Sequence, residues 1–430
     1  MEIEAHTTPA MARPAARLAA AAAPLGFVAV GAFAGWFALN STNAILGVSP
    51  TGAQRMLFGL ALLAVTLAFA QIRTRMAMAA LFFGWYAGAA SSMPSIWASF
   101  FAGSAIPGVL TWLGWAALMA TPFAFAPRNK PGIGVAVGLL AGAVPPLGIF
   151  GLGSPLLTTG AVFPGLGFVG LALTYIFLFL AALLPTASPK LQRAGTVAMV
   201  AVLLFGAVRA VAYTLPEPPQ SSVWAAKTFD GPPSQNVAVA FKKQDDLKRM
   251  VRQALQDGAR LIVLPEGADP QWDDGQAFYW RHVAQLARSK HATVLLGAYI
   301  DDDVMPWRNR DGLVDIATGK FYAAEIPMPI GMWHPWSRGS FPMRMAVAGV
   351  PTVYGPALES ICYEDLLLWP MAWQRALLAL HGQRPSLIVS AANQWFTQDG
   401  TATAQTRSIH MQARIWGLPL MRSVNWAAAK

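Results

Sequence analysis

The chain has 430 residues, of which 55% are hydrophobic and 12% charged, and its formal net charge is +10. A soluble domain has about 25% charged residues, so the composition excludes a single soluble domain. Residues 1–213 hold ten Lys and Arg against two acids, whereas residues 214–430 hold twenty-one against nineteen. The positive excess therefore lies in the apolar half. Because the second half has no basic patch with interleaved aromatics, we expect no direct nucleic-acid binding.

Residues 1–22 form a short polar and Ala-rich lead, predicted to be cytoplasmic. Seven apolar runs follow, at 24–40, 56–71, 77–94, 105–126, 132–152, 161–185 and 195–213. Most approach the length of about 20 residues that spans a bilayer, so residues 23–213 predict a transmembrane bundle of about seven helices. The first and third runs are short, which leaves the count open by one. The first run also fits a signal peptide behind Arg13 and Arg17.

Basic residues mark alternate ends of these runs. The second, fourth and sixth runs are followed by Arg73 and Arg75, by Arg128 and Lys130, and by Lys190 and Arg193. By the positive-inside rule these loops and the N-terminus face the cytoplasm. Seven spans then place everything after residue 213 on the outer side. The expected location is a bacterial inner membrane, crossed several times, with a periplasmic C-terminal domain.

The second half begins with a linker, 214–234, that is rich in proline where it starts, and continues as a soluble α/β pattern over 235–430. Strands are expected at 237–241, 261–264, 293–300, 312–316, 320–326, 352–361, 386–391 and 419–424. Helices are expected at 245–256, 276–290, 366–381 and 404–415. This alternation is typical of a layered sheet domain with helices packed outside.

Two polar residues end strands of this domain. Glu266 follows a buried strand, at the place where α/β folds put functional groups, although a lone acid there also caps the next segment. Cys362 is the only cysteine, and it lies where a strand passes into a helix. A thiol at that junction suits nucleophilic chemistry, whereas a free cysteine by itself is more often a small buried hydrophobe. A single cysteine excludes disulfides within the chain and a cysteine-cluster metal site.

Three stretches around these residues resemble the nitrilase superfamily of carbon–nitrogen hydrolases. They are Leu261-Ile-Val-Leu-Pro-Glu266, Ile361-Cys-Tyr-Glu364, and Asn393-Gln-Trp-Phe396 with the segment from Arg407 to Asn425 that follows it. The resemblance implies an α-β-β-α sandwich over 235–430 and a site that uses Glu, Lys and Cys. A membrane bundle before such a domain is similar to apolipoprotein N-acyltransferases. The segments from Met328 to Trp336 and from Ile361 to Pro370 are closer still to membrane proteins of conjugal plasmid transfer.

The chain departs from the acyltransferase pattern at two site positions. Ala324 stands where the resemblance implies the catalytic Lys, and Met332 where it implies an assisting Glu. The nearest ammonium is that of Lys320, which we expect at a hairpin turn in solvent. Relatives also continue beyond the strand that contains Val424, so the domain is expected to be short at its C-terminus.

The resemblance implies that Glu266 deprotonates Cys362, that the thiolate attacks an acyl carbonyl to give a thioester, and that water or an amine resolves it. Glu364 and Tyr363 are supporting candidates, with Glu364 orienting Glu266 or the substrate. No metal or cofactor is expected. The expected partners are a membrane lipid or another acyl or amide substrate, and conjugation proteins.

Aromatic residues near these segments form a candidate substrate mouth: Trp333, Trp336, Trp369 and Trp373. A membrane-facing position and a place in the core both fit them. The missing Lys leaves a second function open, in which the protein is a catalytically weak structural or assembly component of the conjugation machinery.

Overall fold

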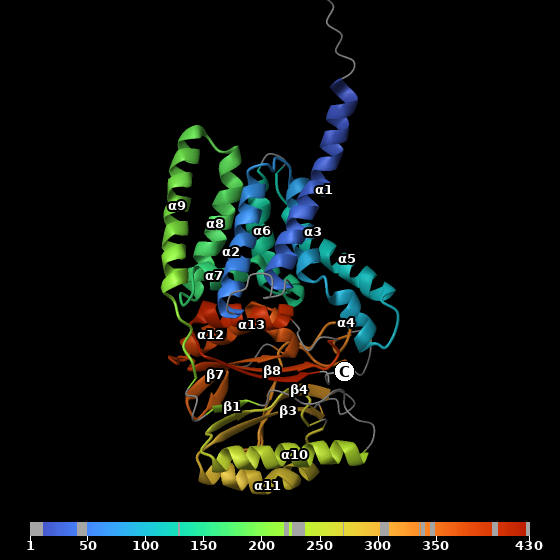
Figure 1. Cartoon of the computed structure of the whole chain (residues 1–430), viewed down its shortest axis with the longest axis vertical. Helices are drawn as coiled ribbons and strands as arrows, with labels where there is room; N and C mark the ends of the chain where they lie inside the picture. Colours follow the sequence, from blue (N-terminus) through green and yellow to red (C-terminus); the bar gives the residue numbers. More distant parts are fainter. Residues whose placement is uncertain are drawn as a thin grey trace, which may run out of the picture.

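The apolar first half and the mixed second half of the chain form two parts stacked end to end (Figure 1). The first is a set of helices, hereafter the bundle. The second is two β-sheets packed face to face with helices outside, hereafter the sandwich. The computed structural model describes residues 12–40, 50–127, 130–218, 223–225, 237–269, 271–301, 309–334, 336, 340–344, 349–397 and 403–426.

The bundle contains nine described α-helices joined in places by short 3₁₀ turns. The α-helices are α1 Ala12–Leu39, α2 Pro50–Phe69, α3 Arg75–Ala89, α4 Met93–Phe100, α5 Ile106–Ala120, α6 Pro131–Ala143, α7 Thr159–Val162, α8 Phe168–Leu183 and α9 Pro189–Ala212. The 3₁₀ turns are η2 Thr121–Ala124, η3 Leu147–Phe150, η4 Pro155–Thr158 and η5 Leu184–Thr186. The fifth apolar run stops being helical at Ala143, because Pro145 and Pro146 cannot continue the ladder of hydrogen bonds.

Helix α3 is the centre of the bundle, and it touches α1 backbone to backbone. A Cβ placed on Gly35 would lie 2.0 Å from the carbonyl oxygen of Trp85, and one on Gly88 would lie 2.0 Å from that of Ala32. Only glycine permits this approach, which is the usual way helices pack closely without a hydrophobic driving force. The contact fixes α3, and the start of α4 with it.

Three helical stretches of the described chain are long and apolar enough to cross a membrane: Ile106–Ala124, Phe168–Thr186 and Pro189–Ala212. Three shorter apolar helices accompany them, at Pro24–Leu39, Leu57–Phe69 and Pro131–Ala143. Helix α9 buries only Gly206, so most of its apolar side chains face outward, while Met199 and Val202 pack against the core. The arrangement of about seven spans stays a prediction.

The sandwich has the expected order of layers, α-β-β-α. The first sheet has the order β1-β2-β3-β4-β5 and the second β6-β7-β8-β9. Their strands are β1 Val223–Ala225, β2 Leu261–Val263, β3 Thr293–Asp301, β4 Asn309–Asp315, β5 Lys320–Ala323, β6 Val350–Thr352, β7 Gly355–Ile361, β8 Leu387–Gln394 and β9 Leu420–Trp426. Helices α10 Val237–Gln256 and α11 Asp274–Ser289 cover the first sheet, and α12 Trp369–Leu380 and α13 Thr403–Trp416 cover the second (Figure 1). Apolar side chains of both sheets form the core between them.

One strand prediction is wrong, and another is correct only in part. Residues 237–241 are the first turns of α10, and Val239 and Phe241 are exposed there, because an alternation of apolar residues this short also fits a helix surface. The first strand is instead β1, inside the predicted linker, where it pairs in parallel with β2. The predicted strand 352–361 is a hairpin, β6 and β7, since Gly355 takes a φ of +104° that turns the chain.

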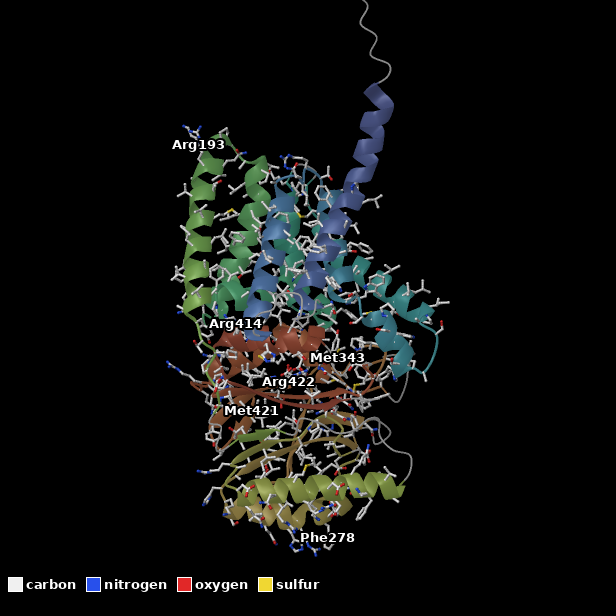
Figure 2. The ribbon with its side chains drawn as sticks, viewed as in Figure 1. Arg193, Phe278, Met343, Arg414, Met421 and Arg422 are labelled. Carbon is white, nitrogen blue, oxygen red and sulfur yellow. The ribbon has the colours of Figure 1, made fainter. Side chains whose placement is uncertain are left out.

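Helix α13 joins the sandwich to the bundle. The Arg407 guanidinium donates to the carbonyl oxygen of Ala38 at the end of α1 (3.0 Å), and Arg414 Nε donates to that of Gly160 in α7 (2.7 Å). Figure 2 shows Arg414 at this junction. One hydrophobic core runs without a break from the bundle helices to the outer face of β7 and β8. The bundle therefore closes one side of the sandwich near Cys362.

Candidate active site

Cys362 lies at the end of β7, as the first residue of the 3₁₀ helix η7 Cys362–Leu366. Its φ is +48°, a left-handed conformation that costs a non-glycine residue energy and is often found at functional sites. Gln405 Nε2 of α13 donates to the Cys362 carbonyl oxygen (2.7 Å), which helps hold this conformation. The side chain is half-buried.

Glu266 follows β2 and meets the Cys362 thiol. Its backbone crosses close over Gly297 of β3, where a Cβ would lie 2.6 Å from the Glu266 Cα, so glycine is required at that point. The buried Glu266 carboxyl hydrogen-bonds to the Cys362 thiol and accepts from the Asn393 backbone N–H. Cys362 Sγ lies 3.7 Å from the Asn393 carbonyl oxygen. The two residues paired by sequence reasoning are therefore in contact.

Burial raises the pKa of the Cys362 thiol well above its ordinary value, and the negative charge of Glu266 beside it raises that pKa further. Burial also raises the pKa of Glu266. The thiol is thus protonated at neutral pH and becomes a nucleophile only when a neighbouring base takes its proton. Glu266 is the base that touches it.

Asp311 of β4 is a third member of the site, which sequence reasoning missed. Its carboxyl group is buried and hydrogen-bonds to that of Glu266, and burial with the Glu266 charge raises the pKa of Asp311 well above its ordinary range. Tyr299 of β3 is the strand partner of Asp311. Burial, and then the charges of Glu266 and Asp311, raise the pKa of Tyr299. Inward-facing and outward-facing residues alternate along a hairpin strand, and this alternation could have identified Asp311 as inward-facing. The identification requires the correct register of the hairpin.

Glu364 holds the segment after the nucleophile in place. Its Oε1 accepts from the backbone N–H groups of Glu325 (2.6 Å) and Ile326 (2.8 Å), and its Oε2 accepts from that of Ile361 (2.9 Å). Burial raises the pKa of Glu364 to about 7. The hydrogen bonds of Glu364 that the structure describes go to backbone amides, and none goes to Glu266, one of the two groups that it was expected to orient, the other being the substrate.

Asp365 and Tyr363 anchor η7 on two sides. The buried Asp365 carboxylate accepts from the hydroxyls of Ser360 (2.7 Å) and Ser390 (2.9 Å) and lies 3.6 Å from the Arg422 guanidinium, which Figure 2 labels in the second sheet. The Tyr363 hydroxyl donates to the carbonyl oxygen of Ile149 in η3 (3.0 Å). The nucleophile segment is therefore fixed to the bundle as well as to the sandwich.

Lys320 does not reach this site. It is exposed at the β4–β5 turn, with its ammonium 5.0 Å from the centre of the Tyr322 ring. Ala324 is buried in the core between the sheets. In the described part of the chain, the hydrogen bonds of Glu266, Asp311 and Cys362 involve no lysine. Met332 lies in the turn after Met328, to whose carbonyl oxygen its N–H donates (2.8 Å).

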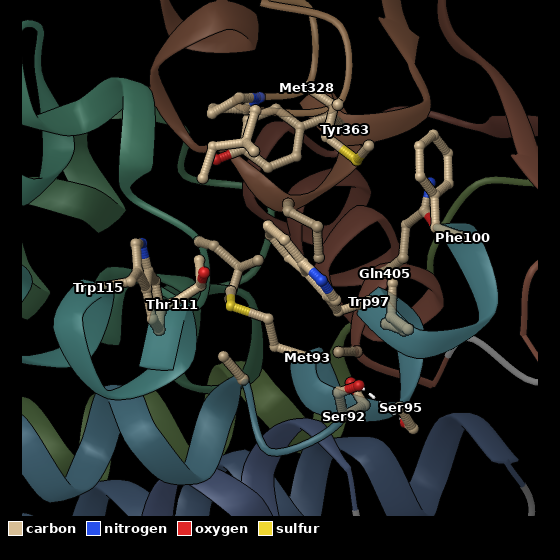
Figure 3. Close-up of a pocket in the computed structure, with 18 of the residues that line it drawn as sticks. Ser92, Met93, Ser95, Trp97, Phe100, Thr111, Trp115, Met328, Tyr363 and Gln405 are labelled. Atoms are coloured by element: carbon tan, nitrogen blue, oxygen red, sulfur yellow. Dashed lines mark hydrogen bonds between the residues drawn. The ribbon is translucent and has the colours of Figure 1, made fainter. Parts of the chain in front are cut away.

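A cavity of about 640 Å³ opens beside Cys362, between the bundle and the sandwich. Helices α4 and α5 form one wall, and η7, α13 and the turn at Met328 form the other (Figure 3). Its aromatic lining comes from Trp97, Phe100, Phe101, Trp115, Phe150, Tyr363 and Phe396. No lining residue in the described chain is charged. The volume lies within the about 300–1,000 Å³ of small-molecule pockets.

The four tryptophans expected at the mouth do not line this cavity. Trp369 is buried against η3, near Gly148, whereas Trp336 is 77% exposed and Trp373 is 39% exposed. Trp333 forms a bridge with Pro329, which does line the cavity. The aromatic wall comes instead from Trp97 and Phe100 on α4, two residues that lie between the predicted apolar runs 77–94 and 105–126.

The arrangement suits attack by a thiol on a carbonyl carbon. A base touches the thiol, a second carboxyl touches the base, and a large apolar space faces the sulfur. Among the described residues, no group of three or more His, Cys, Asp and Glu is placed to hold a metal ion.

Two relatives align with most of the chain. It is 30% identical over 388 residues to the conjugal transfer protein TraB of Agrobacterium fabrum, covering 84% of this chain and 86% of that protein. It is 27% identical over 384 residues to the probable conjugal transfer protein TraB of Sinorhizobium fredii, covering 85% of this chain and 92% of that protein. The predicted resemblance to conjugal transfer proteins is confirmed. No family model matches.

Solved structures match about half of the chain at lower similarity. A point mutant of the Nesterenkonia AN1 amidase from the nitrilase superfamily is 14% identical, with a TM-score of 0.30, and the match covers 50% of this chain and 79% of that chain. A carbon-nitrogen hydrolase from Helicobacter pylori is 15% identical, with a TM-score of 0.29, and the match covers 47% of this chain and 72% of that chain.

Proposed function

Because the chain belongs to the TraB family of conjugal transfer proteins, we propose that it is a membrane-embedded acyl transferase or hydrolase of plasmid transfer, with Cys362 as nucleophile. The observation that carries the proposal is the position of Cys362. The thiol touches Glu266 on one side and faces an uncharged cavity of about 640 Å³ on the other.

The reaction follows from these contacts. Glu266 takes the thiol proton as Cys362 Sγ bonds to the acyl carbonyl carbon, and the carbonyl π electrons move to the oxygen. When this intermediate collapses, the bond from carbon to the leaving oxygen or nitrogen breaks, and Glu266 returns the proton to that atom. Water or an amine then attacks the thioester, gives up a proton to Glu266, and releases the Cys362 thiolate, which takes the proton back.

The lining of the cavity supports a lipid acyl chain as the group transferred. Trp97, Phe100 and Trp115 provide apolar surface, and the charged part of a phospholipid has no counter-charge among the described lining residues. Burying an unpaired charge there is costly. The acyl chain therefore occupies the cavity, and the headgroup remains toward its opening.

In this proposal the bundle lies in the membrane. Helix α9 carries outward-facing apolar residues and runs from Arg193, at the end of the bundle away from the sandwich, to the sandwich itself (Figure 2). The basic residues Lys190 and Arg193 at that far end favour a cytoplasmic location for it. The sandwich and its cavity then lie on the periplasmic side of an inner membrane, beside outer-leaflet lipid and other conjugation proteins.

A second function is favoured by one observation. Ala324 occupies the position of the implied Lys, and Lys320 is turned into solvent. Losing a group that stabilises the oxyanion costs about a hundredfold or more in rate. In this alternative the protein assembles with the conjugation machinery and turns over little substrate.

Lipid turnover separates the two functions. Protein in nanodiscs is mixed with phosphatidylethanolamine labelled in its acyl chains, and lysolipid, free fatty acid and acylated amine are measured by mass spectrometry. We expect products from the wild type and none from Cys362→Ala. Equal traces from both proteins, with plasmid transfer intact in Cys362→Ala, contradict the enzyme and leave the assembly function.

A further inference from the structure

Asp311 stands beside the position of the implied lysine. The β4–β5 ladder pairs Gly312 with Ala323, so the next pair outward is Asp311 with Ala324, whose N–H donates to the Asp311 carbonyl oxygen (2.8 Å). Residues opposite each other in an antiparallel pair project to the same face. Ala324 belongs to the core between the sheets, and Asp311 faces that side too. Because the side chain of Ala324 is only a methyl group, Asp311 supplies the polar side chain of this pair.

The Asp311 carboxyl is aimed at Glu266. The two groups share a hydrogen bond, and both are buried, at 5% and 3% exposure. Asp311 Oδ1 and Glu266 Oε2 have no N–H or O–H donor among the described residues. Two buried carboxyl groups in contact cannot both be ionised, because like charges repel in a low dielectric. A single proton between them satisfies both groups.

We propose that Asp311 is a positioning residue that holds this proton and donates it in a hydrogen bond to the ionised Glu266, in place of a lysine ammonium. The inference rests on the proposed function only in taking Cys362 as nucleophile and Glu266 as its base. The resting site then carries one negative charge, on Glu266. During attack the thiol proton moves to Glu266, the S–C bond forms, and the same single charge appears on the acyl oxygen.

This arrangement keeps Glu266 in its ionised, proton-accepting form without a lysine ammonium. The hydrogen bond from Asp311 favours the charged form of Glu266 and opposes the effect of burial. Other titratable groups act on the pair from neighbouring elements: Tyr299 from β3, and Cys362, Glu364 and Asp365 from η7. Arg310 and Arg344 line a small cavity together with Asp311. That cavity, of about 10 Å³, is also lined by Ala324.

The test uses the single cysteine of the chain, so that alkylation reports on Cys362 alone. The rate of reaction with iodoacetamide is measured from pH 5 to 9 on detergent-solubilised wild type, Asp311→Leu and Asp311→Asn. Asp315→Asn is the matched control, because Asp315 lies on the same strand and face but bonds the turn at Thr318. Folding is checked by gel filtration and thermal unfolding.

We expect Asp311→Leu to shift the rising limb of the pH profile upward by about one unit or more, because Glu266 loses its donor. At pH values below the rising limb, a shift of one unit lowers the rate about tenfold. Asp311→Asn keeps a hydrogen-bond donor to Glu266, so we expect the rising limb of its pH profile close to that of the wild type. We expect Asp315→Asn to leave the limb unchanged. A folded Asp311→Leu with an unshifted limb, or equal shifts in the Leu and Asn variants, overturns the inference.

A second measurement covers the case in which Asp311→Leu does not fold. The infrared difference spectrum of wild type minus Asp311→Asn at pH 7 is expected to show the carbonyl stretch of a protonated carboxylic acid. A carboxylate band alone shows that Asp311 is ionised and overturns the inference. Neither test needs an acyl substrate, so both can be interpreted even if no acyl transfer is found.

Discussion

The Tyr363 hydroxyl donates a hydrogen bond to the carbonyl oxygen of Ile149 at 3.0 Å. Tyr363 follows the nucleophile, and Ile149 belongs to a 3₁₀ turn of the bundle 214 positions earlier. The bond connects the chemistry of the sandwich to the helices that we propose to lie in the membrane. The same turn supplies Phe150 to the cavity, and the Phe150 carbonyl oxygen accepts from Trp115 Nε1 (2.8 Å). The bundle is therefore part of the site as well as a support for it.

Filling the cavity should shorten the acyl chain that the protein accepts. Gly114 lines the cavity on α5, and a Cβ there meets no atom within 4 Å, so Gly114→Phe is accommodated locally while its ring enters the space. We expect activity on long-chain nitrophenyl esters to fall about tenfold or more, since each methylene in a pocket contributes about 1–3 kcal/mol. Activity on nitrophenyl acetate should change little.

Gly59→Phe on α2 is the matched control, because a Cβ at Gly59 also meets no atom within 4 Å and Gly59 does not line the cavity. Equal losses of activity on long and short esters in Gly114→Phe, or the same loss of activity in Gly59→Phe, would show that the cavity does not bind the acyl chain.

The base and the exposed ammonium should respond differently to mutation. Glu266→Gln removes the group that touches the thiol, and general-base catalysis contributes about a hundredfold or more. Lys320→Ala removes a solvent-exposed side chain, whose loss typically changes stability by about 0.5 kcal/mol or less. The rates are compared with a short nitrophenyl ester. If Lys320→Ala is inactive although folded, the β4–β5 register is shifted and Lys320 belongs to the site.

Glu364 should make stability depend on pH. Its pKa is about 7 in the folded protein, above its ordinary value of 4.5, so unfolding releases a proton between those values. The free energy of unfolding therefore falls as pH rises from about 4.5 to 7, by an order of about 3 kcal/mol, and levels off above that. Urea unfolding across this range should show a shallower slope in Glu364→Gln. Equal slopes in the two proteins would mean that Glu364 is already ionised at low pH.

The side of the membrane is testable with fusions. The charge pattern of the bundle predicts that alkaline phosphatase fused after Thr214 is active and that a reporter confined to the cytoplasm is silent there. The reverse pattern would show that the number of spans is even.

The alternation of strands and helices after Leu261 allowed a layered α/β domain with Glu266 and Cys362 at strand ends to be predicted, and the resemblance to the nitrilase superfamily implied the α-β-β-α order of the layers. It did not allow β1 to be predicted, since three residues beside a Pro-rich stretch carry too little pattern. Asp311 was missed because its role depends on the register that places it near Glu266. A single position along a strand does not reveal that register.

The cavity was beyond sequence reasoning for a different reason. Phe100 and Cys362 both line it but lie 262 positions apart, and their meeting depends on how α4 leaves the bundle. Closeness in sequence was misleading for Trp369. Although it lies seven positions after Cys362, it begins α12 and is buried against the bundle.

The most direct test is the covalent intermediate itself. Wild type and Glu266→Gln, reconstituted with phosphatidylethanolamine and phosphatidylglycerol, are quenched in acid and their intact masses measured, with peptide mapping of the adduct. The account predicts a mass increase of one fatty acyl group, hydroxylamine-sensitive and located on Cys362, in the wild type, and a much smaller fraction in Glu266→Gln. An unmodified Cys362 in fully folded protein, across lipid compositions and short nitrophenyl esters alike, would contradict it.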